Sequence, residues 1–147
     1  MIKLFTIGFT KKTAETFFSL LKRAGVKKII DIRLKNVSQL AGFAKGKDLE
    51  FFSRAILGAG YEHDINLAPT KELFSDYKNK KITWYQYEKE YISILDNRNI
   101  INEIDFAQLD GSCLLCSEHQ PDKCNRRLLA EYLKKANKDV EIIHLIS

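Results

Sequence analysis

The sequence predicts a three-layer α/β domain, in which a mostly parallel sheet of about five strands carries helices on both faces. Short apolar runs alternate along the chain with stretches of helical periodicity. Parallel strands need crossover connections, and helices of this kind supply them. A length of 147 residues suits one unit with a real hydrophobic core, so we expect residues 1–147 to form a single domain.

The first third of the chain predicts two strands with a helix between them. Residues 3–9 are a short apolar run, and residues 27–33 are a second run that becomes polar at its end. Between them Thr13 is a suitable N-cap, and Gly25 stands where the residue after a helix belongs. Residues 34–47 contain Gly, Ser, Asn and Lys without periodicity and are expected to form a long loop.

The middle of the chain is mainly helical in pattern. After the loop, a helix that ends at GAGY has an apolar stripe of Leu49, Phe52, Ala55 and Ile56. Residues 61–65 give a third strand, and Thr70 after Pro69 opens a helix to about Lys80. A T-x-x-Q capping box at Thr83 opens another helix. Apolar side chains at helical spacing usually pack in a core, so we assign no function to Trp84, Tyr87, Tyr91, Ile94 and Leu95.

The end of the chain predicts two helices and two strands. A short helix is expected over residues 100–109, followed by a buried strand over residues 112–116. A longer helix begins near Pro121, because proline suits a first helical turn, and runs to residue 137. Residues 140–146 form the last strand.

Composition favours a soluble protein of the cytoplasm. The chain is 45% apolar and 29% charged with only two prolines, which excludes a disordered or low-complexity class. The opening MIKLFTIGF is too short for a membrane span and poor as a signal peptide, so no membrane partner is expected. Three cysteines, an odd number, fit a reducing compartment better than a disulfide framework. Nothing in the pattern indicates a homo-oligomer.

The positive charge is concentrated at the start of the chain. Residues 1–54 hold 12 Lys and Arg against 4 Asp and Glu, whereas residues 55–147 hold 12 against 15. Such an excess attracts nucleic acid or another polyanion, because phosphate contacts supply much of non-specific affinity. A solvated lysine-rich surface is the alternative.

Polar residues follow the predicted strands, and in α/β folds ligands bind beyond the carboxyl ends of the strands. We therefore expect one edge of the sheet to gather Gly8, Thr10, Asp31, Arg33, His63, Asp64, Ser117, Glu118 and His119. Two residues apart on a strand, Asp31 and Arg33 point to the same face. Either they form a structural ion pair, or Asp31 orients Arg33 toward a ligand carboxylate or phosphate.

The segment LLCSEHQPDKCNRR is the richest in reactive side chains. A helix N-terminus there attracts anions, and Arg126 rather than Arg127 is expected to face the edge. Glu118 is either a general acid or base or an arginine partner.

The cysteines admit three interpretations. A zinc site from Cys113, Cys116, His119 and Cys124 is disfavoured, because Cys113 and Cys116 lie three apart on a strand and point to opposite faces. We interpret Cys113 and Cys116 as small core residues. For Cys124 a reactive thiol, favoured by the helix N-terminus and nearby arginine, and a packing role both remain open. No metal is expected.

The phosphate-binding P-loop and the G-x-G-x-x-G fingerprint are absent from the sequence, so no nucleotide cofactor is implied.

Four segments, taken together, resemble the Domain of Unknown Function 488 family over essentially the whole chain: FTIGFT, IIDIRLKNVSQLAGFAKGKDLEFF, LAPTKELFSDYKNKKITWYQYEKEY and LLCSEHQPDKCNRRLLAEYL. The resemblance implies a three-layer α/β domain of prokaryotic proteins whose molecular function is not established. It marks as signature positions Asp31, Arg33, the loop 38–45, Cys116, Glu118, Cys124 and Arg126.

Two positions depart from the family pattern. Asn125 stands where the family usually has the histidine of a Cys-His-Arg motif, and Phe9 replaces the histidine of a Gly-His pair. Asparagine forms hydrogen bonds but does not titrate. If either family histidine moves protons, that role passes here to Glu118, Asp31 or a remaining histidine.

Three functional hypotheses follow. The first is binding of an anionic ligand, a nucleotide or nucleic-acid segment, by Gly8, Arg33, Ser38, Phe43, Lys45, His119, Asn125 and Arg126, with Phe43 either stacking on a base or folding into the core. The second is a hydrolase or transferase acting on a phosphate- or base-containing substrate, with Glu118 or Asp31 as general base and Cys124 as a further catalytic candidate. The third is a plain interaction module.

Overall fold

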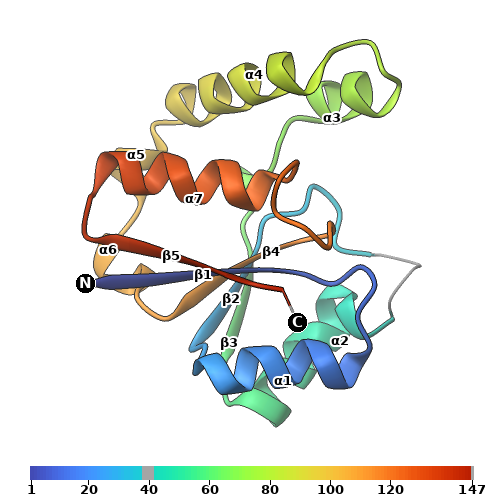
Figure 1. The fold of residues 1–147 in the computed structure, drawn as a ribbon, viewed down its shortest axis with the longest axis vertical. Helices are drawn as coiled ribbons and strands as arrows, with labels where there is room; N and C mark the ends of the chain where they lie inside the picture. The colour runs from blue at the N-terminus through green and yellow to red at the C-terminus, as the bar shows by residue number, and fades with distance from the viewer. Residues whose placement is uncertain (38–41, 147) are drawn as a thin grey trace.

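A computed structural model describes residues 1–37 and 42–146 and confirms the α/β fold (Figure 1). One five-stranded sheet has the order β3-β2-β4-β1-β5, and every neighbouring pair is parallel. The strands are β1 (Ile2–Gly8), β2 (Lys28–Asp31), β3 (Gly60–His63), β4 (Ser112–Cys116) and β5 (Val140–Leu145). Because all strands run the same way, their carboxyl ends lie along one edge, as predicted.

Helices cover both faces of the sheet, which gives three layers (Figure 1). Helices α1 (Ala14–Ala24) and α2 (Gly46–Phe52) lie on one face, and α7 (Asn125–Ala136) lies on the other. Beyond α7 lie α3 (Lys71–Lys78) and α4 (Trp84–Asn97), and the short helices α5 (Ile100–Glu103) and α6 (Phe106–Leu109) lead back to the sheet. Single turns of other helix types span Gly42–Ala44, Ser53–Leu57 and Ile65–Leu67.

The alternation of side chains along the central strands divides the core in two. On β4, Cys113 and Leu115 pack toward α1 and α2, whereas Leu114 and Cys116 pack toward α7. The opposite orientation of Cys113 and Cys116 was predicted from strand geometry and is confirmed.

The predicted helix ends are confirmed where cap residues define them. Thr13 accepts from the Thr16 amide, and Gly25 ends α1 in the left-handed conformation with φ of 71°. Thr83 and Gln86 form the complete capping box of α4. The side chains of Thr13, Thr83 and Gln86, and the backbone N–H of Gly25, satisfy backbone groups that a helix end leaves free.

The helices differ from the prediction in three respects. Ala55 and Ile56 are exposed, because the helix widens into a π turn at Ser53–Leu57 and rotates them out of the predicted stripe. The helix expected over residues 100–109 is two helices, separated where Asp105 caps the second. Helix α7 begins at Asn125 instead of near Pro121, so Cys124 is its N-cap.

In the described ranges, 1–37 and 42–146, no helix has the length and apolar character needed to cross a membrane.

Candidate functional site

A pocket of about 460 Å³ opens at the carboxyl edge of the sheet, on the α7 side. Five segments line it: the end of β2, helix α3, the first turn of α4, the end of β4 and the residues before α7. They contribute Arg33, Leu34, Lys35, Pro69, Lys71, Phe74, Ser75, Tyr77, Lys78, Trp84, Tyr87, Cys116, Ser117, Glu118, Lys123, Cys124 and Asn125. Its volume is in the range of small-molecule sites.

The lining combines positive charge with aromatic rings. Its cations are Arg33, Lys35, Lys71, Lys78 and Lys123, and its one carboxylate is Glu118. The rings of Tyr77, Trp84 and Tyr87 contact one another, with centroids 5.0 to 5.4 Å apart. Phe74 adds a half-exposed ring to the same wall. The pocket thus offers a ligand flat apolar surfaces beside free ammonium groups.

Asn125 connects the pocket wall to the start of α7. The Tyr87 hydroxyl, whose pKa burial raises, donates to Asn125 Oδ1 at 2.5 Å. Asn125, a predicted ligand residue, therefore lines the pocket, but its oxygen already accepts a hydrogen bond from Tyr87.

Asp31 and Arg33 form the predicted ion pair. Arg33 donates through Nε and Nη2 to both carboxylate oxygens of Asp31, at 2.9 and 2.7 Å, and the Tyr61 hydroxyl donates to Asp31 as well. Asp31 is fully buried and outside the pocket lining, so it is poorly placed to be a general base. Arg33 lines the pocket, but most of its N–H groups already donate hydrogen bonds to Asp31 and to the Ala44 carbonyl oxygen.

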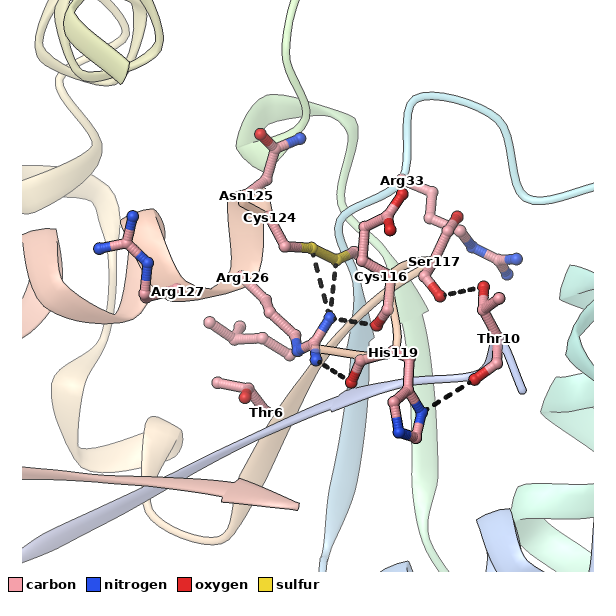
Figure 2. The surroundings of a disulfide bond; sticks show 12 residues. Thr6, Thr10, Arg33, Cys116, Ser117, His119, Cys124, Asn125, Arg126 and Arg127 are labelled. Carbon is pink, nitrogen blue, oxygen red and sulfur yellow. Dashed lines mark hydrogen bonds between the residues drawn. A yellow bond between two sulfur atoms is a disulfide. The ribbon is translucent and has the colours of Figure 1, made fainter. Parts of the chain in front are cut away.

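Arg126 lies beneath the pocket and is fully buried. Its Nη1 donates to the Glu118 carbonyl oxygen at 2.6 Å, and its Nη2 donates to the His119 carbonyl oxygen at 3.0 Å. Figure 2 shows the same Nη1 contacting both sulfurs of a disulfide between Cys116 and Cys124, at 3.4 Å each. Burial lowers the pKa of Arg126 to about 10. Arg126 thus faces the sheet edge while Arg127 points away, as predicted, but a ligand in the pocket does not reach its guanidinium (Figure 2).

The disulfide corrects the interpretation of the cysteines. Cys116 is a core residue, as interpreted, but it is also bonded to Cys124, although the odd number of cysteines favours a reducing compartment over a disulfide framework. Residues 117–123 form a loop that returns the chain to the end of β4, which brings Cys124 onto Cys116. Cys113 is the buried free cysteine. In the described segments no group of three or more His, Cys, Asp and Glu is placed to hold a metal ion.

Gly8 has a packing role in place of the predicted ligand contact. A Cβ atom at this position would overlap the Glu118 carbonyl oxygen and lie 2.9 Å from Arg126 Nη1. The absence of a side chain therefore lets the loop after β4 close over β1, and Gly8 is not among the residues that line the pocket.

Three more predicted ligand residues lie away from the pocket. The ring of Phe43 packs on that of Phe17 in the α1-side core, with centroids 5.2 Å apart. Of the two predicted roles, stacking on a base and folding into the core, this position fits the second. Lys45 is the residue before α2. The His119 ring turns toward Thr10, whose carbonyl oxygen is 3.2 Å from Nδ1 (Figure 2). Ser38 lies outside the described residues.

The pocket thus contains Arg33, Glu118, Cys124 and Asn125 from the predicted set, and it adds residues that the sequence did not indicate. Tyr87 is a core residue, as expected, yet it and Trp84 also form the pocket wall. Their spacing indicated a buried stripe, and no local pattern shows that the first turn of α4 lies at the carboxyl edge.

The fold and the pocket define an α/β protein with a ligand-sized site at the carboxyl edge of a parallel sheet. The sequence matches a family described as Domain of unknown function DUF488 over residues 13–133. The chain therefore belongs to the DUF488 family. Comparison with curated proteins and with solved structures finds no match.

Proposed function

We propose that the protein binds an anionic ligand with an aromatic ring, a nucleotide, in the pocket between α3, α4 and α7. The observation that carries this proposal is the presence of five cationic residues and four aromatic rings in one pocket with a single carboxylate. Lysines bind phosphate as flexible point charges, and aromatic side chains stack on bases of any sequence.

The state of the cations supports the same ligand class. Among the described residues Lys35, Lys71, Lys78 and Lys123 form no ion pair, and all four are exposed. Their charges are therefore free to neutralise a ligand phosphate. A volume of about 460 Å³ suits a mononucleotide or the terminal nucleotide of a strand better than an extended polymer.

A hydrolase or transferase reaction is the second candidate, and it would use Glu118 as general base. Glu118 is exposed at the pocket rim, and among the described residues its carboxylate makes no hydrogen bond that would orient it. This geometry supports binding more strongly than catalysis. A panel of phosphate- and base-containing substrates, assayed with the wild-type chain and Glu118→Gln, tests the reaction.

Titration of mononucleotides against the fluorescence of Trp84, the one tryptophan of the chain, tests the binding proposal. We expect quenching that saturates and an affinity that falls with added salt. Lys78→Gln and Lys123→Gln should each weaken binding about fivefold, roughly 1 kcal/mol. Lys138→Gln, an exposed lysine outside the pocket, is the matched control. Unquenched fluorescence at low salt for every nucleotide and for short single-stranded oligonucleotides would refute the proposal.

A further inference from the structure

Arg126 is a buried cation without a carboxylate partner. Its contacts are two carbonyl oxygens and two sulfurs, and its Nε has no partner within the described part of the chain. Arg33, which is also buried at the same edge, is neutralised by Asp31. A buried charge is most stable when it is both paired and hydrogen-bonded. Within the described segments Arg126 has hydrogen bonds but no ion pair, although the charge of Glu118 acts on it from a greater distance.

Reduction of the disulfide would place an anion in direct contact with Arg126. It converts Cys116 and Cys124 into thiols, and a thiolate at either position would lie beside Arg126 Nη1, which is 3.4 Å from both sulfurs. A guanidinium next to a thiol favours its ionised form.

Cys124 is the better placed of the two to be the thiolate. It is the N-cap of α7, a helix of 12 residues, and its side chain makes no capping hydrogen bond. The positive end of the helix dipole therefore acts on its sulfur in addition to Arg126. Cys116 is the last residue of β4, and Cys113 is fully buried, which raises its thiol pKa.

Both sulfurs belong to residues that line the pocket. Each residue is 5% exposed, so the pair is nearly buried and the pocket is the route by which we expect a molecule to reach it. The charged and titratable side chains around the pair in the pocket are Arg33, Lys35, Tyr87, Glu118 and Lys123, with Arg126 beneath. The excess of cations favours a substrate that carries carboxylates.

We propose that Cys116 and Cys124 are a reversible dithiol–disulfide couple that exchanges with low-molecular-weight anionic disulfides, with Cys124 as the nucleophile and Cys116 as the resolving thiol. The Cys124 thiolate attacks one sulfur of the substrate disulfide, the substrate S–S bond breaks, and one substrate thiolate leaves. Cys116 loses its proton to solvent and attacks Cys124 Sγ, which forms the Cys116–Cys124 bond and releases the second substrate thiolate. The substrate gains two electrons and the protein loses two. A dithiol reductant reverses the change. This activity goes beyond nucleotide binding and does not depend on it.

Alkylation of the fully reduced chain as a function of pH tests the thiolate. We expect Cys124 to react with iodoacetamide at neutral pH at least tenfold faster than Cys116 or Cys113, with a midpoint below the ordinary thiol value of about 8.5. Arg126→Gln should raise that midpoint by about one pH unit. Arg127→Gln is the matched control, because that guanidinium is engaged by Glu88 and Glu131 away from the sulfurs. Should Arg126→Gln fail to fold, the wild-type midpoint alone decides: an ordinary value overturns the proposal.

Oxidised glutathione, a small disulfide with carboxylates, tests the exchange reaction. The reduced wild-type chain should form the Cys116–Cys124 bond, and Cys116→Ser should stop at a mixed disulfide on Cys124, both read by mass spectrometry. Cys124→Ser should form a mixed disulfide at least tenfold more slowly. A wild-type chain that keeps all three thiols in excess oxidised glutathione overturns the proposal, whatever the outcome of the nucleotide titration.

Discussion

At the scale of single residues, two buried arginines at one edge of the sheet have different partners and therefore different roles. Arg33 is neutralised by Asp31, which fixes the end of β2, whereas Arg126 holds two carbonyl oxygens and the sulfurs of Cys116 and Cys124. The first arrangement is a structural ion pair. The second leaves the Arg126 guanidinium under the pocket, where its positive charge would stabilise a thiolate at Cys116 or Cys124.

Gly8 permits the loop after β4 to bring its carbonyl oxygens to Arg126, so substitution of Gly8 should lower the stability of the fold. In Gly8→Ala the new methyl group meets the Glu118 carbonyl oxygen, and the loop over β1 must move. We expect the free energy of unfolding in urea to fall by about 2–3 kcal/mol. Gly60→Ala is the control, because its Cβ would meet only Lys28 Cγ at 3.8 Å. Equal stability of the two variants would show that the loop is not held against Gly8.

His144 should make stability depend on pH. Burial and then the charge of Arg126 lower its pKa, and its Nδ1 lies 2.5 Å from Thr6 Oγ1. Between its folded and unfolded pKa values the unfolded chain binds more protons, so the free energy of unfolding falls as pH falls below about 6.5. Urea unfolding at about pH 7.5 and about pH 5.5 should show a smaller loss for His144→Gln than for the wild-type chain. Identical losses would contradict this assignment.

At the scale of secondary-structure elements, the pocket depends on how α4 docks against α7. Tyr87, on the first turns of α4, donates to Asn125 at the start of α7, and the aromatic cluster with Tyr77 and Trp84 joins α4 to α3. The wall of the pocket is thus part of the core.

Removal of the α4–α7 hydrogen bond should destabilise the chain measurably. Tyr87→Phe leaves the part-buried Asn125 Oδ1 without this donor, so we expect a loss of about 1 kcal/mol in the free energy of unfolding. Tyr85→Phe is the matched control: that ring is 63% exposed, and the phenyl group keeps its contact with Lys89. A similar loss in both variants would contradict the role given to Asn125.

The elements were predictable because their signals are local, whereas the site depends on distant contacts. Caps such as Thr13, Gly25 and Thr83 mark helix ends in the sequence itself. Strand alternation placed Cys113 and Cys116 on opposite faces. The disulfide and the Trp84 wall depend on the path of the loop 117–123 and on the docking of α4, which no short sequence window determines.

At the scale of the whole molecule, the order of the strands in the sheet determines which strands lose their backbone hydrogen bonds last when the protein unfolds. Strand β4 lies between β2 and β1, is buried along its length, and is the centre of the sheet, while β3 is an edge strand with exposed residues. We expect β4 amides to exchange hydrogen only through global unfolding and β3 amides to exchange through local opening. Exchange read by mass spectrometry checks this order, and equal protection of β3 and β4 would contradict it.

The parallel pairing of β1 with β5 also has a practical consequence. Ile2 lies beside Val140, and Ile7 lies beside Leu145, so the first strand starts at the edge remote from the pocket and the last strand finishes at the pocket's own edge (Figure 1). An affinity tag or a surface-immobilisation linker joined ahead of Met1 would leave the pocket mouth clear. The same appendage joined after β5 would begin at the carboxyl edge of the sheet, the edge at which the pocket opens, with β1 between it and β4.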